Sequence, residues 1–164
     1  MAYLSFSYWQ SNHWDANCYI GHGSILRGDY GRIEIGDGTA VEEGVIVHAP
    51  PGDTNQIGKK VTIGHGAVVH GKHIGDGAVI GMGTVISSWS EIGEQTIVAE
   101  GCVVKLKQTI PPKVVVAENP AKIVRGITEK DKEFWNWVKA FNNSFSQTRR
   151  FNFCYPVFPC FLQR

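Results

Sequence analysis

The sequence predicts a mainly β protein, built as a parallel β-helix of hexapeptide repeats and followed by one α-helix. Three observations lead to this fold. Aliphatic residues recur six positions apart over most of the chain, 19 glycines are spread through the same region, and a helical pattern follows it near the C-terminus. This six-residue spacing of aliphatic residues, called the beat below, is typical of a parallel β-helix. In that fold each repeat supplies one short strand and one corner. Neither helical periodicity nor simple strand alternation produces this spacing.

The beat assigns the core. With three repeats to a coil, the inward positions are Ile20, Leu26, Ile35, Val41, Val47, Ile57, Ile63, Val69, Ile74, Ile80, Ile86, Ile92, Val98, Val104, Ile110 and Val116. Each of these is expected to stack on its equivalent in the next coil, at the spacing of about 4.8 Å between paired strands. The six-residue spacing is interrupted between residues 26 and 35 and between 47 and 57, and it is one residue short between 69 and 74. These breaks predict loops, where functional residues concentrate.

Stacking the coils also brings outward residues into register. The residue after the third beat of each coil forms one column, which contains Arg27, His48, His70, Ser87 and Lys105. A second column, on another face, contains His22, Glu43, His65, Met82 and Glu100. His65 and His70 are separated by a corner and by up to about 16 Å of extended backbone, so one subunit is not expected to bring both to one metal ion.

His48 and His70 lie on adjacent rungs, which suits a shared metal ion. Catalytic zinc sites take three protein ligands, so this pair is one ligand short. A neighbouring chain in a threefold ring would supply its own His65. The alternative is that all three are ordinary exposed histidines.

Several motifs occur together: Arg27-Gly28-Asp29, Ile63-Gly64-His65-Gly66, His70-Gly71 and Asn119-Pro120-Ala121-Lys122. As a set they resemble the γ-class carbonic anhydrases and their relatives, over roughly residues 18 to 140. The resemblance implies a left-handed β-helix and a homotrimer. It also implies a metal ion held at the trimer interface by His48, His65 and His70. Zinc is the expected metal, with iron or cobalt as alternatives, because histidine sites accept all three.

The resemblance implies reversible hydration of carbon dioxide to bicarbonate by a metal-bound hydroxide, which is a lyase reaction. Glu42 stands where the family has a glutamine, and we expect it to position the hydroxide or to accept a proton. Arg27 and Asp29 are expected to form an ion pair that supports the site and the trimer contact.

Three other functions stay open. A hexapeptide acyltransferase would use a histidine as general base and bind coenzyme A. The run from Arg27 to Arg32 is similar to relatives encoded with phenylacetate and carnitine metabolism, which suggests an acyl-CoA thioesterase. A non-catalytic trimeric scaffold with a degenerate site is the third alternative.

Composition and charge limit the classes of partner that the chain can bind. The net charge of +1 gives no basic patch for nucleic acid, and no apolar run is long enough to span a membrane. The first basic residue is Arg27, so no basic segment precedes an apolar stretch as in a secretory signal. We therefore expect a cytoplasmic protein whose partners are carbon dioxide, bicarbonate and two further copies of the chain.

The chain divides into four segments. Residues 1–17 lack the beat and are expected to cap the first coil, and residues 18–126 form the β-helix. Residues 127–146 are expected to form an α-helix, which begins with a capping box at Thr128 and Asp131. Its apolar stripe of Phe134, Trp137, Val138 and Phe141 is expected to pack along a β-helix, either its own or a neighbour's. Residues 147–164 form an aromatic tail to which the sequence assigns no role.

Overall fold

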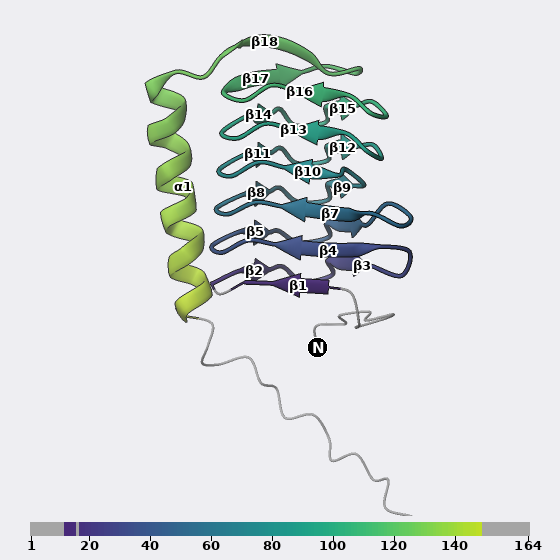
Figure 1. Ribbon diagram of the computed structural model, residues 1–164. Coiled ribbons are helices and arrows are strands. Elements are labelled where there is room, and N and C mark those ends of the chain that lie inside the picture. Colours follow the sequence, from purple (N-terminus) through teal and green to yellow (C-terminus); the bar gives the residue numbers. More distant parts are fainter. Residues whose placement is uncertain (1–11, 16, 149–164) are drawn as a thin grey trace, which may run out of the picture.

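A computed structural model describes residues 12–15 and 17–148 of the protein. They form a triangular parallel β-solenoid with one helix beside it (Figure 1). The first sheet contains β1 (Asn12–Trp14), β4 (Arg32–Ile35), β7 (Thr54–Ile57), β10 (His73–Ile74), β13 (Glu91–Ile92) and β16 (Thr109–Ile110). The second contains β2 (Tyr19–Ile20), β5 (Ala40–Val41), β8 (Thr62–Ile63), β11 (Val79–Ile80), β14 (Ile97–Val98), β17 (Val114–Ala117) and β18 (Lys122–Gly126). The third contains β3 (Ile25–Arg27), β6 (Ile46–His48), β9 (Val68–Val69), β12 (Val85–Ile86) and β15 (Val103–Val104). Their outward sides are called the first, second and third face below.

The solenoid is left-handed, as expected. In Figure 1 the strands of the first sheet run from right to left across the front, the chain passes behind at the left, and each coil lies above the previous one. The strands pair in parallel with their equivalents one coil away, except that β18 runs antiparallel to β17 across a register shift. This antiparallel strand covers the last coil, where a further parallel coil would otherwise continue.

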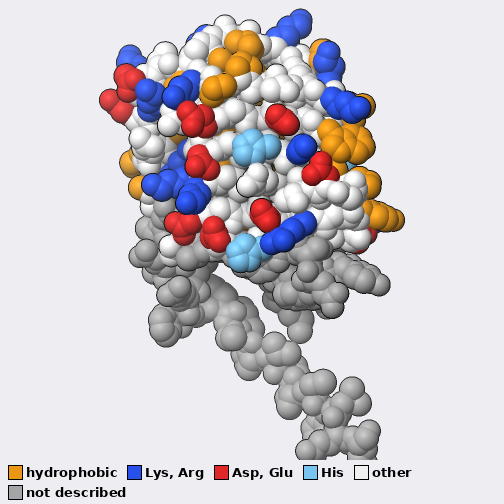
Figure 2. Space-filling view, in the orientation of Figure 1, with side chains coloured by type: hydrophobic (Ala, Val, Ile, Leu, Met, Phe, Trp, Pro, Cys, Tyr) orange, Lys and Arg blue, Asp and Glu red, His pale blue; other side chains and the backbone are white. Residues whose placement is uncertain are grey.

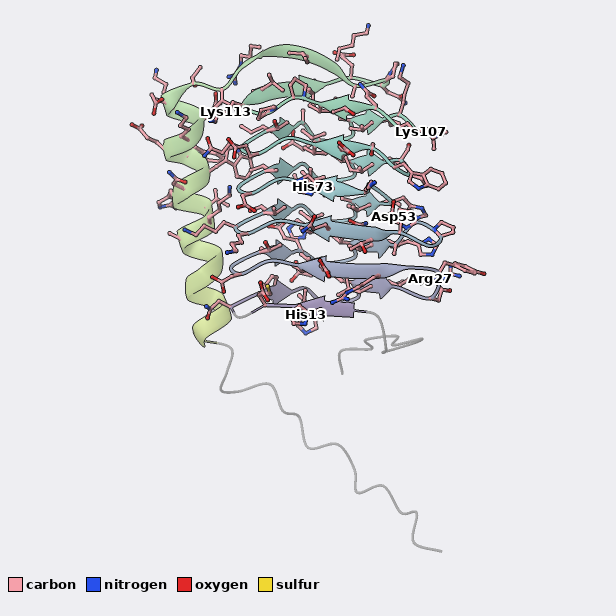
Figure 3. All side chains as sticks on the ribbon, in the orientation of Figure 1. His13, Arg27, Asp53, His73, Lys107 and Lys113 are labelled. Carbon is pink, nitrogen blue, oxygen red and sulfur yellow. The ribbon has the colours of Figure 1, made fainter. Side chains whose placement is uncertain are left out.

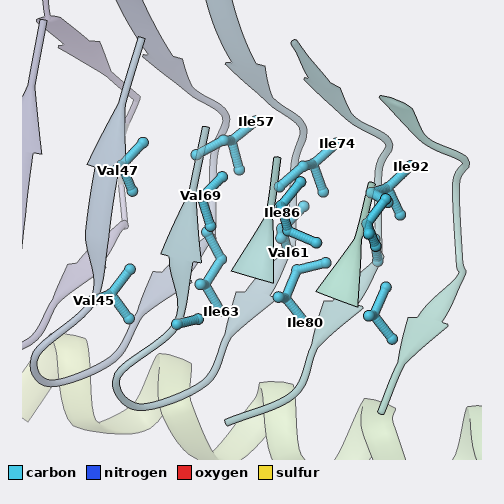
Figure 4. Packing of buried hydrophobic residues seen from close by; sticks show 14 of the residues in the cluster. Val45, Val47, Ile57, Val61, Ile63, Val69, Ile74, Ile80, Ile86 and Ile92 are labelled. Carbon is cyan, nitrogen blue, oxygen red and sulfur yellow. The ribbon is translucent and has the colours of Figure 1, made fainter. Parts of the chain in front are cut away.

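The core follows the six-residue beat. Every beat residue from Ile35 to Val116 is at most 3% exposed, and Leu26 is 8% exposed. The registers Ile63 opposite Ile80 and Val69 opposite Ile86 show the expected one-coil stacking, which Figure 4 shows from close by. Because each coil buries its aliphatic residues against the next, the core is one continuous column. The sequence-based core assignment is confirmed from Leu26 onward, and Ile20 in the first coil is half-buried against this core.

The solenoid begins earlier than expected. Strand β1 pairs in parallel with β4, and its register places Trp14 opposite Ile35, so a strand of the first sheet lies within the segment expected to be a cap. The rest of that expected cap, residues 1–11 and 16, lies outside the described residues. The aromatic tail lies outside them from residue 149 onward.

Helix α1 (Glu129–Thr148) begins with the predicted capping box. The Asp131 backbone N–H donates to Thr128 Oγ1 at 3.3 Å, and the Thr128 N–H donates to Asp131 Oδ2 at 2.8 Å. Arg125 donates two hydrogen bonds to the same carboxylate, at 2.6 and 3.0 Å. Arg125 and Thr128 together hold the pKa of Asp131 far below its usual range. The helix start is thereby fixed beside the end of the solenoid.

The face of α1 that meets the solenoid differs from the predicted stripe. The helix runs along the second face (Figure 1), where Trp135 and Lys139 line a groove of about 380 Å³ and Lys139 Nζ donates to the Gly77 carbonyl at 2.5 Å. Phe134 and Trp137 are 55% and 65% exposed, so they do not pack on this chain's own solenoid. The periodicity identified an amphipathic helix, and Val138 of its stripe is half-buried. Packing of Phe134 and Trp137 on a neighbour's solenoid stays a prediction. The helix also lacks the apolar length that a membrane crossing requires, among the residues that are described.

Candidate metal centre

The structure places His48 and His70 together on the third face. Strands β6 and β9 pair with Val47 opposite Val69, so the next residue of each strand, a histidine, projects from the same column. The two imidazole rings are half-buried, their centroids are 4.7 Å apart, and their planes meet at 80°. Two imidazoles at this separation can offer nitrogen atoms to one ion between them.

Arg27 and Asp29 line the same site. Asp29 Oδ1 lies 3.2 Å from His48 Nε2, and its other oxygen accepts hydrogen bonds from Arg27 at 2.7 Å. Burial opposes ionisation of Asp29, but the hydrogen bonds from Arg27 and His48 and the charge of Arg27 outweigh it and lower the pKa. Tyr30 completes the cluster, with the Arg27 guanidinium 5.5 Å from its ring centroid and the His48 ring at 6.0 Å. Figure 3 shows Arg27 at the edge of the lower coils, where these strands turn.

The environment of His70 favours the neutral imidazole. Burial lowers the pKa of His70, and the charges of His48 and Arg27 lower it further. Metal ions bind the neutral form of histidine, so a half-buried imidazole of this kind suits a ligand. The donor set therefore fits a divalent metal, apart from the missing third ligand.

Buried Asn55 supports both histidines from inside the coil. Its side chain is fully buried, and Nδ2 donates to the carbonyl oxygens of His48 and Val69 at 3.4 Å each. These carbonyls belong to the two rungs that carry the histidines, so Asn55 ties the rungs together. Its Oδ1 atom has no hydrogen-bond partner among the described residues.

His65 lies elsewhere, at a corner of the second face. Its Nε2 is 3.3 Å from Glu42 Oε2, and its Nδ1 is 3.1 Å from Glu43 Oε2. The hydroxyl of Tyr19, one coil earlier, donates to Glu43 Oε1. The structure thus joins Glu42 to His65, and joins Arg27 and Asp29 to His48. Within residues 12–15 and 17–148 of one chain, no three His, Cys, Asp or Glu side chains lie close enough to hold a metal.

Beside the column that contains the histidine pair, the third face carries an apolar ladder. Its outward residues are in register over five strands, and they are Ile25, Ile46, Val68, Val85 and Val103. Ile25, Ile46 and Val85 are each 36 to 37% exposed. A flat ladder of β-branched side chains of this kind is typical of a surface that another protein covers.

Comparison with known proteins agrees with this architecture. The profile of the family described as "Bacterial transferase hexapeptide (six repeats)" matches residues 71–105. The chain is a hexapeptide-repeat protein. It is 35% identical over 118 residues to gamma carbonic anhydrase 2, mitochondrial, of Arabidopsis thaliana, an alignment that covers 68% of this chain and 42% of that protein. It is 37% identical over 120 residues to carnitine operon protein CaiE of Escherichia coli K12, covering 73% of this chain and 61% of CaiE. The resemblance to the γ-class carbonic anhydrases is confirmed.

A solved structure extends the likeness over more of this hexapeptide-repeat chain. A hexapeptide transferase family protein from Anaplasma phagocytophilum superimposes with a TM-score of 0.74 at 26% identity, covering 84% of this chain and 92% of that one. The chain spans only 42 to 61% of the length of the two curated relatives named above, so their whole activities are not transferred to it directly.

Two residues of the centre were not found from the sequence. Asn55 precedes the beat residue Ile57 by two positions, and strand alternation turns both inward. A polar residue at an inward-facing position of a strand was therefore a readable signal. Tyr19 gave no such signal, because its contact with Glu43 depends on a side chain reaching across one coil.

Proposed function

We propose that the chain forms a homotrimer in which His48 and His70 of one subunit and His65 of the next hold a divalent metal, and that this centre hydrates carbon dioxide reversibly to bicarbonate. The observation that carries the proposal is the contact of His48 and His70 on adjacent rungs of an apolar outward face. The similarity to a gamma carbonic anhydrase supports the reaction.

The arrangement of the site supports a trimer. The third face offers two ligands and an apolar ladder, whereas the second-face corner offers His65 with an exposed side chain. A contact of the third face of one copy with the corner of the next is heterologous, and three such contacts close a ring. Each interface then contains one complete set of three histidines. We propose zinc as the metal, with iron or cobalt as alternatives.

The chain's own residues have separate tasks in this scheme. The metal, when bound, lowers the pKa of water so that a nucleophile is available at neutral pH. Asp29 holds the imidazole of His48 in place, and Arg27 keeps Asp29 ionised. Glu42 enters the centre with His65 and provides a carboxylate that orients water or accepts its proton. The apolar side chains of the third face exclude bulk water around a small apolar substrate.

Acyl transfer or thioester hydrolysis is the second candidate. The match to a transferase hexapeptide profile and the similarity to CaiE favour it, since both fall on the same repeats. In that case a histidine of the interface would act as general base, and coenzyme A rather than a metal would be the cofactor. A scaffold without activity is the remaining alternative.

One set of assays separates these functions. The protein is purified without chelator, its metal content is measured, and carbon dioxide hydration is followed by stopped flow with a pH indicator. Hydration that depends on metal and on His70 supports the anhydrase. Turnover of acetyl-CoA by metal-free protein would contradict it in favour of the second candidate, and a metal-loaded trimer inert in both assays would favour the scaffold. The cytoplasmic location stays a prediction.

A further inference from the structure

The ring of His65 lies between two carboxylates of its own chain. Glu43 faces Nδ1 at 3.1 Å, and Glu42 faces Nε2 at 3.3 Å. The Glu42 side chain is 19% exposed, while that of Glu43 is 41% exposed. The two acidic residues are therefore not equivalent. Glu42 is the more buried of the two, and it faces Nε2, the ring nitrogen that Glu43 does not contact.

The backbone of Glu42 and the side chain of Glu43 are held in position. The Glu42 N–H donates to the Ile63 carbonyl at 2.9 Å, and its own carbonyl accepts from Ser24 Oγ at 2.7 Å. Gly21 of the preceding coil lies directly against this corner, since a Cβ atom there would come within 2.6 Å of the Glu42 carbonyl carbon. Tyr19 fixes Glu43 by a hydrogen bond. The backbone of the corner is thus fixed, and Glu42 is 19% exposed beside His65.

The arrangement has a chemical consequence. In the neutral ring that carries its proton on Nδ1, beside Glu43, Nε2 has a lone pair, as in histidines that bind metals through one nitrogen and a carboxylate through the other. A lone pair that faces a carboxylate oxygen at 3.3 Å is repulsive unless a positive charge lies between them. A proton or a cation can supply that charge.

The separation of the two atoms matches a shared metal ion. In a tetrahedral zinc site the bonds to nitrogen and to carboxylate oxygen are about 2.1 Å, which places two ligand atoms about 3.4 Å apart. His65 Nε2 and Glu42 Oε2 are 3.3 Å apart. We propose that Glu42 is a fourth protein ligand, so that each interface site combines two histidines of one subunit with a histidine and a glutamate of the next.

This inference rests on the proposed interfacial metal centre and specifies its chemistry. A carboxylate ligand adds one negative charge to a set of neutral imidazoles, which binds a divalent cation more tightly. Zinc sites expand from four to five ligands, so Glu42 does not close the centre to substrate. One carboxylate oxygen ligates while the other remains free to accept a proton.

The test uses Co²⁺, whose visible absorption weakens as its coordination number rises. Wild-type protein, Glu42→Gln and Glu43→Gln are loaded with Co²⁺, and affinity is measured by competition with a chelator. Glu42→Gln keeps the size of the side chain and removes the charge. We expect it to lower Co²⁺ affinity by about 100-fold and to intensify the absorption. Glu43→Gln, which alters only the support of His65, should lower affinity by about 10-fold and leave the band unchanged.

The outcomes separate this inference from the function on which it rests. Equal affinity and equal spectra for wild type and Glu42→Gln, with binding still abolished by His70→Ala, would overturn the role of Glu42 alone. Wild-type protein that binds no Co²⁺ would overturn the metal centre as a whole. Circular dichroism and solution mass of each variant establish that the fold and assembly are retained.

Discussion

The first and third faces of the solenoid are built on the same inward beat but present opposite surfaces. Outward residues of the first face are polar and in register, namely His13, Glu34, Gln56, His73, Glu91 and Thr109. Figure 2 shows side chains of both charges spread over this face, and Figure 3 shows His13 and His73 well apart on it. The third face is an apolar ladder on which His48 and His70 touch.

The difference shows that the inward beat and the outward ladder carry separate information. The beat determines the fold on all three sides, whereas the outward residue of each rung decides whether a face meets water or a partner. The number of strands between two histidines of one face decides whether their side chains can meet. His13 and His73 are separated by the rungs of Glu34 and Gln56, while no rung separates His48 from His70.

The largest expected effect comes from removing one histidine on each face. His70→Ala deletes a proposed ligand and should abolish metal binding, whereas His73→Ala on the first face should leave the metal content unchanged. Elemental analysis of both purified variants measures this. A full metal complement in His70→Ala would refute the proposed ligand set.

The next effect concerns assembly. Ile46→Glu places a carboxylate in the apolar ladder, where an unpaired buried charge would cost several kcal/mol at each proposed interface, and it should turn the proposed trimer into monomers. Gln56→Glu makes a similar change on the first face and should leave the mass in solution unchanged. Analytical ultracentrifugation distinguishes the two, and an intact Ile46→Glu trimer would show that the third face is not the interface.

Asn55→Ala tests the support of the histidine pair from inside the coil. It removes the hydrogen bonds to the His48 and Val69 carbonyls, which should lower the free energy of unfolding by about 1 to 3 kcal/mol and weaken metal binding by about 10-fold. Gln56→Ala, at the adjacent outward position, is the control. Denaturant unfolding and metal competition measure both effects. Equal metal affinity in the two variants would mean that the rungs hold their spacing without Asn55.

The smallest effect lies on the second face, under the helix. Burial, together with the charge of Lys60, lowers the pKa of Lys139 to about 8 from the ordinary 10.5. The unfolded chain therefore binds this proton more tightly, and the Lys139 contribution makes stability rise with pH between about 8 and 10.5. Lys139→Met should remove that rise without altering metal content, while Lys130→Met should preserve it. Thermal unfolding across this pH range checks the difference, and a rise that survives in Lys139→Met would exclude this lysine as its source.

Much of the fold could be predicted from the sequence because the repeat ties chain position to spatial position. The beat placed Ile63 under Ile80 and His48 beside His70 without knowledge of any contact. Strand β1 could not be predicted, since residues 12–14 lack aliphatic residues at the beat. The residues that join α1 to its own solenoid could not be singled out, because Trp135 and Lys139 lie off the regular stripe, of which Phe134 and Trp137 are exposed.

The candidate site was predictable only in part. The adjacency of His48 and His70 follows from the strand register. The separate position of His65 follows from the corner that lies between His65 and His70. The contacts of His65 with Glu42 and Glu43 depend on side-chain conformations, which periodicity does not specify. The pairing of Arg27 with Asp29 was expected, but the link from Asp29 to His48 needed the distance between them.

A metal site shared between subunits has a direct test by complementation. His65→Ala and His70→Ala are each expected to form trimers without metal, because each lacks one histidine at every interface and the two histidines that remain, even with Glu42, bind too weakly to retain metal through purification. Co-expressed in equal amounts, the two variants assemble mixed trimers in which about a quarter of the interfaces join an intact His48 and His70 pair to an intact His65. Metal content should return to about a quarter of the wild-type value. Mixed trimers without metal would contradict an interfacial site, and so would a His65→Ala variant that keeps its full metal content.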